Sequence, residues 1–451
     1  MTTSTNTENA AALQHRFCEV DPKLASIVTA KTTRPMTAEA DLKESDGKVK
    51  RIYFFGHFGS ANFGNEITLQ TALFHARQWF PDAEFACICT HPKVLASTQK
   101  IEGIPISRDF SWLCKRRIGL VGLLRKIFVG VPCELVRWFE MLETLRGVDM
   151  LIVPGTGLLT DAYGLQGWGP YSLFKWSLMA KICRCKLSFI SVGAGPLYSA
   201  LGRWFVKSAL SMADFRSYRD DASMNYMKKC GFLNNGDRIF PDLVFGLPET
   251  LKPKNGNREG RRRVVGLGLM WYAGKYSVAN PDDAIYRQYL ETLVIFAQWL
   301  LDHDYDISLL LGEATDWTVL EEFKSLLKAR GGVYNQERVI DQPAQSVDQL
   351  LPQIAATDFV VATRFHNVVL SLFMDKPVIA ISFHHKCDSL MSQMGLGKYC
   401  HDINHMSASA LIGQFQDLEK ESDQVKSVVR QNVEQSRKAL DEQYNFIFAK
   451  R

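Results

Sequence analysis

The sequence predicts an α/β protein made of two doubly wound, Rossmann-like lobes with a helical C-terminal tail. Short β-rich runs alternate with helical patterns, several runs end at glycine-containing turns, and one polar basic stretch divides the alternation into two series. Strands that alternate with helices through short loops form parallel sheets covered on both faces. A chain of 451 residues is also too long for one compact core, so two domains are expected.

The first series of elements follows an N-terminal stretch without periodicity. Residues 1–48 are rich in Thr, Ala, Lys and Glu, which predicts a flexible leader. Residues 49–248 are predicted to form the N-terminal lobe, because β-rich runs there alternate with amphipathic patterns. The expected strands are residues 51–55, 149–153 and 187–192, and the first helix carries Leu69, Leu73, Ala76 and Phe80 on one stripe.

The second series begins after a polar, basic linker over residues 249–263. Residues 264–405 are predicted to form the C-terminal lobe. Its expected strands are residues 264–269, 306–311, 358–362 and 377–382, and its expected helices are residues 317–330, residues 365–374 and a helix from Pro281 towards Asp302. Residues 406–451 are mostly helical and highly charged, and such a tail often crosses back to the first lobe in two-lobed folds.

Composition and charge limit the possible functions. The chain is 46% hydrophobic and 22% charged, which is typical of a globular protein. The net charge of +5 suits an anionic substrate or a membrane surface and is too weak to indicate nucleic acid. Because no secretory leader and no apolar run of membrane-spanning length is found, a cytoplasmic protein is expected, with the inner face of the membrane as a more specific alternative.

The ten cysteines do not predict a metal site. The close pairs, Cys87 with Cys89 and Cys183 with Cys185, have one intervening residue, whereas zinc sites use two to four and a second matching pair. We therefore expect buried structural thiols and no bound metal.

Glycine-rich turns follow three expected strands, at the sheet edge where ligands of parallel α/β folds bind. The turn over residues 56–66 has three glycines before a helix start, where backbone N–H groups favour an anion, although a purely structural tight turn is the alternative. Two further turns place Gly155 and Gly157 after one strand and Gly193 and Gly195 after another. These glycines either contact a ligand or provide positive φ angles.

Cationic side chains follow two strands of the second series. Arg364 and His366 enter a helix, where the guanidinium suits a phosphate or carboxylate and the helix start tunes the imidazole. His384, His385 and Lys386 follow the next strand, at the same sheet edge. Together they predict an electropositive pocket for a doubly charged acid. The alternatives are a satisfied structural Arg–His pair and exposed loop histidines.

In this order, these segments resemble the polysaccharide pyruvyl transferase family over about residues 51–396. The similarity lies in Asn62-x-Gly64-x-Glu66, the Pro154–Asp161 loop, Gly193-x-Gly195-Pro196, Tyr218-Arg-Asp220 with Pro241-Asp242, Arg364-Phe-His366, Lys376-Pro-Val-Ile and Lys386…Met394-Gly-Leu396. Asn65 and Thr156 depart from the acidic residue and the glycine usual in the family.

The resemblance implies a two-lobed, GT-B-like enzyme that transfers a pyruvyl unit from phosphoenolpyruvate to two hydroxyls of a sugar in a surface polysaccharide, forming a cyclic ketal. It implies catalytic roles for His366 and Arg364. It implies substrate binding by Lys386, His385, Asn62, Gly64, Glu66, Gly155, Gly157, Asp161, Gly193 and Gly195. Phosphoenolpyruvate is the expected donor substrate, and neither a cofactor nor a metal is expected.

Residues 113–142 mix apolar and basic side chains, a pattern suited to an anionic membrane and to a lipid-linked saccharide acceptor. A helix pair packed on the lobe with solvated basic residues is the alternative.

Two other functions of the protein remain open. A nucleotide-sugar glycosyltransferase of the same architecture would need an acidic residue in the second lobe to bind a ribose. A non-catalytic family member in polysaccharide assembly is the other, because of Asn65 and Thr156.

Overall fold

A computed structural model describes residues 49–60, 62–108, 126–165, 169–232, 235–253, 260–272, 283–313, 316–330, 337–342 and 344–449. The chain divides into two units, residues 1–49 and residues 50–451. The second unit holds almost all of the described residues. The predicted leader, residues 1–48, lies outside them.

The first sheet has seven parallel strands in the order β3-β2-β1-β4-β5-β6-β7. They are β1 (Arg51–Gly56), β2 (Glu84–Cys89), β3 (Glu102–Pro105), β4 (Met150–Pro154), β5 (Lys186–Val192), β6 (Phe215–Tyr218) and β7 (Arg238–Ile239). The three strands predicted for this lobe are confirmed as β1, β4 and β5. Their side chains are buried on both faces, as expected for a parallel sheet covered by helices.

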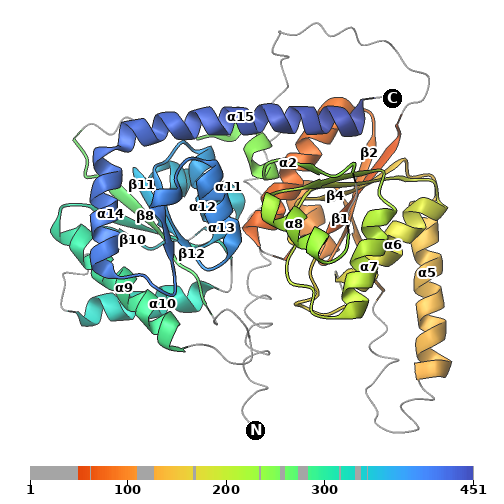
Figure 1. Ribbon diagram of the computed structural model, residues 1–451, viewed down its shortest axis with the longest axis horizontal. Coiled ribbons are helices and arrows are strands. Elements are labelled where there is room, and N and C mark those ends of the chain that lie inside the picture. Colours follow the sequence, from red (N-terminus) through yellow and green to blue (C-terminus); the bar gives the residue numbers. More distant parts are fainter. Residues whose placement is uncertain are drawn as a thin grey trace, which may run out of the picture. The chain divides into compact units, whose positions relative to one another are not determined.

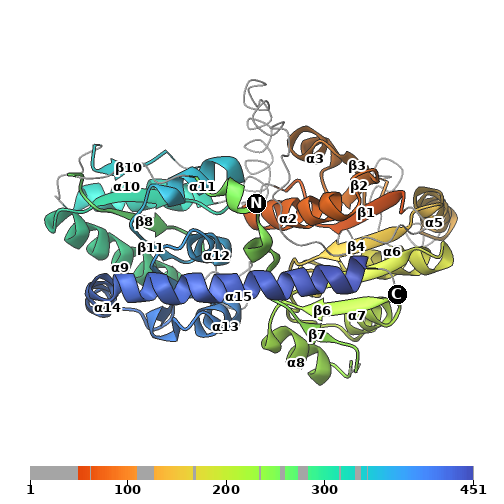
Figure 2. The same ribbon diagram turned by 90° about the horizontal axis from the view of Figure 1, so that it is seen from above.

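Helices cover both faces of this sheet (Figures 1 and 2). They are α2 (Phe63–Trp79), α3 (Pro92–Gln99), α5 (Val131–Leu145), α6 (Pro170–Ile182), α7 (Ala200–Ser211) and α8 (Asp221–Lys229). Side-chain caps fix the starts of three of them, because the oxygens of Asn62, Ser199 and Asp220 accept hydrogen bonds from first-turn amides of α2, α7 and α8. Each of these starts lies at the carboxyl edge of the sheet.

The second sheet has six parallel strands in the order β10-β9-β8-β11-β12-β13. They are β8 (Val264–Gly268), β9 (Asp306–Leu310), β10 (Val339–Ile340), β11 (Phe359–Ala362), β12 (Val378–Ser382) and β13 (Cys400–Asp402). Its helices are α9 (Asp283–Asp302), α10 (Trp317–Ala329), α11 (Val347–Ala355), α12 (Phe365–Phe373) and α13 (His385–Gln393). The four predicted strands and the helices at residues 317–330 and 365–374 are confirmed; the predicted start at Pro281 lies outside the described residues.

Both sheets reverse their strand order at one place, β1 to β4 in the first and β8 to β11 in the second. In open parallel sheets, ligands bind beyond the carboxyl ends of the strands at such a switch point. The turns after β1, β4 and β11, singled out from the sequence, therefore lie where this topology forms a site.

The tail consists of α14 (Ala408–Lys420) and α15 (Ser422–Phe448), and α15 crosses back to the first sheet (Figures 1 and 2). In its first half, the side-chain amide of Asn432 donates to the Met394 carbonyl beside α13, and near its end the Ile447 carbonyl accepts from Lys186 of β5. The tail thus packs against elements of both sheets.

The cysteines of the described residues are free thiols. Cys87, Cys89 and Cys185 are buried, Cys183 is half-buried, and no disulfide links them, so the structural role predicted for these four is confirmed. No helix in the described part of the chain is both long and apolar enough to cross a membrane.

Candidate active site

The starts of α2 and α12 meet where the two switch points face each other. Gly64 belongs to the first turn of α2, and a Cβ atom placed on it would lie only 1.9 Å from Nδ1 of His366. The imidazole of His366 therefore occupies the space that any side chain at position 64 would need. Backbone pairing between Asn62 and Glu313 joins the same two regions. The structure brings together the predicted residues Asn62, Gly64 and His366.

Arg219 lies next to this contact, directly after β6. Its guanidinium pairs with the buried carboxylate of Asp242 at 3.1 Å and lies over the Phe365 ring, 4.6 Å from the ring centre. Gly193 leaves room for it, since a Cβ there would lie 2.8 Å from Nη2 of Arg219. The buried Asp220 carboxylate pairs with its Nε at 3.6 Å, but this Nε has no hydrogen-bond acceptor among the described residues.

Lys386 provides a second cation at the start of α13. A Cβ on Gly157, in the turn after β4, would lie 3.5 Å from the Lys386 ammonium. No carboxylate of the described residues lies within 4 Å of this half-buried ammonium, whereas Lys175, Lys252 and Lys324 each pair with one. His384 caps α13 by accepting a hydrogen bond from the Lys386 amide, and its ring lies 4.0 Å from that of the exposed His385.

Four helix starts therefore converge on one region. α2 meets α12 through Gly64 and His366, and α8 packs against α13, which follows β12 beside β11. Each helix start presents unpaired backbone N–H groups and the positive end of a helix dipole. With Arg219 and Lys386 added, the region is suited to a small ligand that carries two negative charges.

The electrostatic surroundings set the protonation of two groups. Burial, with Arg219 and Lys386 nearby, lowers the pKa of His366 to about 4 despite the opposing effect of Asp242, so the imidazole is neutral at pH 7. Burial and then Arg219 lower the pKa of Lys386 to about 8. Lys386 is therefore mostly charged at pH 7 but is easily deprotonated. His366 can accept a proton, whereas Lys386 can bind an anion.

Arg364 differs from its predicted role as a free anion-binding fork. Its Nε and Nη2 atoms donate to Asp316, which is fully buried, at 2.8 and 2.6 Å, and Nη1 pairs with Glu313 at 2.8 Å. All three nitrogens are held by carboxylates of its own lobe. Arg364 thus fits the alternative of a structural ion pair that fixes the entry to α12. These contacts do not support its assignment as a catalytic residue that binds an anion.

Glu66 and Asn62 hold the first glycine turn. The Gly59 amide, at a positive φ of 76°, donates to Glu66 at 2.6 Å, and Asn62 caps α2. Burial raises the pKa of Glu66 to about 7. Asn65, where the family usually has an acidic residue, donates its side-chain amide to the His57 carbonyl. These residues shape the turn that carries Gly64.

Asp161 stabilises a loop and does not join the cluster. Its oxygens accept hydrogen bonds from the amides of Tyr198 and Ser199 and from the Ser199 hydroxyl, and these bonds lower its pKa although burial opposes them. The prediction that it contacts substrate has no support in this geometry. Gly155 packs against the Ser191 carbonyl and Gly195 against Thr160, whereas Gly157 and Gly193 face the two cations.

Sequence reasoning missed Arg219 and Asp242 as site residues. Both lie in segments noted for their resemblance, Tyr218-Arg-Asp220 and Pro241-Asp242, but neither follows a strand predicted from the sequence. The available clue was that both charged residues lie in short motifs and that both motifs follow strands of the same lobe. Thr156 is a further candidate, because its hydroxyl is buried after β4 without a hydrogen-bond partner among the described residues.

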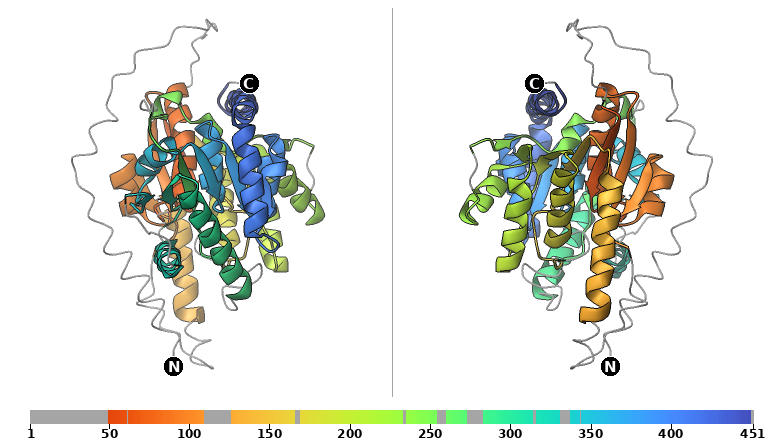
Figure 3. Two further views of the ribbon diagram at one scale, coloured as in Figure 1. Left: turned by 90° about the vertical axis from the view of Figure 1, so that its left-hand side faces the viewer. Right: turned by 90° about the vertical axis from the view of Figure 1, so that its right-hand side faces the viewer.

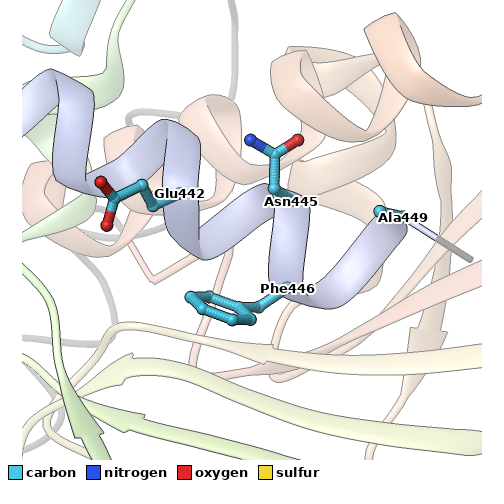
Figure 4. A pocket seen from close by; sticks show the side chains of 4 residues that line it. All are labelled: Glu442, Asn445, Phe446 and Ala449. Atoms are coloured by element: carbon cyan, nitrogen blue, oxygen red, sulfur yellow. The ribbon is translucent and has the colours of Figure 1, made fainter. Parts of the chain in front are cut away.

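Other features of the surface lie apart from this cluster. A depression of about 300 Å³ is lined by Glu442, Asn445, Phe446 and Ala449 of α15, none of them a residue of the cluster (Figure 4). No three His, Cys, Asp or Glu side chains of the described segments are arranged to hold a metal ion.

Two parallel α/β domains whose carboxyl edges meet at a shared site define a GT-B-like protein. In agreement, a UDP-N-acetylglucosamine 2-epimerase structure matches with a TM-score of 0.56 and 13% identity, over 90% of this chain and 97% of that one. A glycosyltransferase from Rickettsia africae matches with a TM-score of 0.53 and 10% identity, over 89% and 99%. At these identities the similarity shows the fold alone.

The family follows from the sequence comparisons. The family model described as polysaccharide pyruvyl transferase matches residues 62–385, and the chain belongs to this family. The amylovoran biosynthesis protein AmsJ of Erwinia amylovora is 25% identical over 309 residues, which are 66% of this chain and 72% of that protein. The protein is accordingly a transferase of the polysaccharide-modifying kind, and the resemblance found in the sequence is confirmed.

The contrast between Arg364 and Lys386 predicts opposite effects on stability. Arg364→Met should lower the free energy of unfolding by about 3 kcal/mol, because it leaves the buried Asp316 without a cation. Lys386→Met should leave it unchanged or raise it, since the lysine is desolvated without an ion pair. Urea unfolding at pH 7 measures both. An Arg364→Met protein of wild-type stability would contradict the structural role.

The contact between Gly64 and His366 predicts a coupled pair. Gly64→Ala should lower the free energy of unfolding by about 1–3 kcal/mol, because the new methyl group overlaps the imidazole. His366→Ala should relieve this loss, so that the double variant is more stable than the two separate effects imply. Gly413→Ala in α14, where a Cβ meets nothing within 4 Å, is the matched control and should be neutral or stabilising. Additive effects would show that the two helix starts do not touch.

Proposed function

We propose that this protein transfers a pyruvyl unit from phosphoenolpyruvate to two hydroxyls of a sugar, forming a pyruvate ketal on a surface polysaccharide or its lipid-linked precursor. The observation that carries the proposal is the group formed by Arg219, Lys386 and a neutral His366 at converging helix starts. Membership of the family and similarity to an amylovoran biosynthesis protein support it.

The donor site is assigned to the two cations. Phosphoenolpyruvate carries a phosphate and a carboxylate, which need fixed positive charges and N–H donors. Lys386 and the first-turn amides of α12 and α13 supply these from the second lobe, and Arg219 supplies a guanidinium from the first. Asp242 orients Arg219 through a 3.1 Å ion pair, and Asp220 pairs with its Nε at 3.6 Å, although the Nε–H group has no hydrogen-bond acceptor among the described residues. A bound dianion would raise the pKa of His366, which allows it to hold a proton during the reaction.

The reaction then follows with balanced protons. The first sugar hydroxyl adds to the central carbon of the donor while the methylene carbon gains a proton and becomes a methyl group. The carbon–oxygen bond to phosphate breaks, and the second hydroxyl adds to the same carbon. One of the two hydroxyl protons accounts for the proton that the methyl group gains, and the other leaves with phosphate. His366 accepts a hydroxyl proton and returns it to the leaving phosphate, a role worth about 10²–10⁴-fold in rate.

The contacts disfavour the rival nucleotide-sugar glycosyltransferase. That function requires an acidic residue of the second lobe to bind a ribose. The carboxylates beside the start of α12, Glu313 and Asp316, are already engaged by Arg364. Among the described residues near α12, they are therefore poor ribose ligands.

Donor consumption tests the proposal. Purified protein with phosphoenolpyruvate and a membrane-derived saccharide acceptor should release phosphate and add the mass of one pyruvyl ketal to the acceptor, measured by mass spectrometry. His366→Gln should lower turnover about 10²–10⁴-fold, whereas the exposed His405→Gln should match the wild type. Consumption of a sugar nucleotide instead would support the glycosyltransferase. Donor binding without turnover on any acceptor would support a non-catalytic role.

The low pKa of Lys386 predicts how donor binding depends on pH. Above pH 8 the free protein loses this charge, so KM for phosphoenolpyruvate should rise by up to about tenfold per pH unit, while Lys386→Met should show a high and pH-independent KM. Unfolding would not explain this rise in KM. Because the pKa of Lys386 is lowered from 10.5 in the folded protein, the lysine loses its proton more easily there than in the unfolded chain. The contribution of Lys386 to stability therefore increases as the pH rises through this range. Steady-state kinetics from pH 7 to about 9.5 measure the effect. A flat wild-type profile would remove Lys386 from the donor site.

A further inference from the structure

Helix α5 is apolar on two sides, because Met141 and Leu145 pack into the core while other large apolar side chains face outward. On its inner side, Glu134 pairs with Lys175 of α6 at 2.6 Å, pairs with Arg137 and accepts a hydrogen bond from Tyr171. On its outer side lie Val131, Leu135, Val136 and Phe139, and Phe128 precedes them in the π-helical turn Lys126–Gly130. Phe128, Leu135 and Phe139 are exposed by 73%, 65% and 63%. An apolar stripe exposed on the side away from the core indicates that this face meets something other than water.

Neighbouring elements extend this apolar surface. Tyr163 lies in the turn after β4, Tyr198 precedes α7, and Leu201 and Trp204 lie on the first turns of α7. All four are more than half exposed. α6 packs against both α5 and α7, so the three helices lie side by side (Figures 1 and 3). Of the fifteen exposed large hydrophobic residues among those described, nine belong to this set, here called the apolar rim: Phe128, Val131, Leu135, Val136, Phe139, Tyr163, Tyr198, Leu201 and Trp204.

The apolar rim begins at the site edge of the first sheet. In a parallel α/β sheet each helix starts at the carboxyl edge of the strands and ends at the opposite edge. Tyr163 and Tyr198 follow the same strands, β4 and β5, as the site glycines Gly157 and Gly193. The start of α7 carries Leu201 and Trp204, and the start of α5 carries Val131. The acidic residues Glu140 and Glu143 lie on the last turns of α5, towards the other edge.

We propose that the apolar rim binds the surface of an anionic phospholipid bilayer and presents the active site to acceptors held there. Charge argues for lipid rather than a protein partner, since residues 110–126, directly before the stripe, contain five basic residues and no acidic one. Basic residues that adjoin an apolar stripe in the sequence favour an anionic lipid surface. Tyr and Trp side chains, which the rim also contains, prefer the bilayer interface.

This inference deepens the proposed function by specifying a lipid-linked saccharide as the acceptor class. A bilayer at the apolar rim confines both enzyme and acceptor to one surface, next to the turns that carry Gly157 and Gly193. Lipid binding itself is measured without turnover, so its failure and a failure of the pyruvyl-transfer proposal can be told apart.

Flotation of the full-length protein with vesicles tests the surface. The protein should float with vesicles of phosphatidylcholine and phosphatidylglycerol, and binding should weaken with phosphatidylcholine alone and with rising salt. The double variant Leu135→Ser/Phe139→Ser should lower the vesicle partition coefficient at least about tenfold, because two exposed apolar anchors are lost. Ile182→Ser is the matched control, since Ile182 is 56% exposed at the end of α6, on the opposite edge, and should bind as the wild type does.

Absence of flotation of the wild-type protein would overturn the proposal, and so would an equal loss of binding in the Ile182→Ser control. A third contrary outcome is a dimer, seen by light scattering, that the double variant disrupts while vesicle binding is absent. That outcome would assign the apolar rim to contact with a second copy of the chain. Circular dichroism and urea unfolding confirm that the variants are folded. With a soluble saccharide acceptor the double variant should turn over like the wild type, and with a lipid-linked acceptor in vesicles about tenfold more slowly. Equal rates on both acceptors would also contradict the proposal.

Discussion

The missing side chain at position 64 is the constraint on which the site depends. The first turn of α2 and the first turn of α12 come so close that only a glycine leaves space for the His366 imidazole. This approach brings the positive ends of helices from two separate sheets to one place and desolvates the imidazole between them. Desolvation in turn lowers the pKa of His366 to about 4 and, in the same cluster, that of Lys386 to about 8. The absence of a side chain at position 64 therefore permits the desolvation that lowers the proton affinity of His366.

The strands that the sequence predicted are those buried on both faces, because burial leaves a run of apolar residues that periodicity detects. β1, β4 and β11 are examples. Most of the strands it did not predict are short or lie at the edges of the sheets, whereas β2, with six residues and a buried run, was missed despite its apolar character. β7 has two residues and β13 has three, with polar side chains such as His401 and Asp402. Partners across the sheet hold such segments in place, and a single sequence does not show those partners.

For the site, the sequence identified candidate residues by their place after a strand, and two of them, His366 and Lys386, lie in the cluster. The sequence alone does not show which carboxylates surround each cationic side chain in the folded structure. Arg364 was the most prominent candidate, yet the carboxylates that occupy it, Glu313 and Asp316, come from about fifty residues earlier in the chain. Arg219 drew less attention and is the guanidinium at the cluster. Charge compensation is a property of the folded structure, so residue type alone does not distinguish a structural arginine from a binding one.

α15 links the two halves of the site through buried polar contacts. Its Gln443 side chain, fully buried, accepts hydrogen bonds from Ser191 of β5 and Ser217 of β6. Ser191 has a positive φ of 49° at a register shift between these strands, a strained arrangement that persists only where its surroundings hold it. The residues that follow, Gly193 and Arg219, line the cluster. Because α15 also contacts Met394 at the end of α13, one helix supports the strand ends behind Arg219 and the helix that carries Lys386. The position of this tail therefore influences the spacing of Arg219 and Lys386.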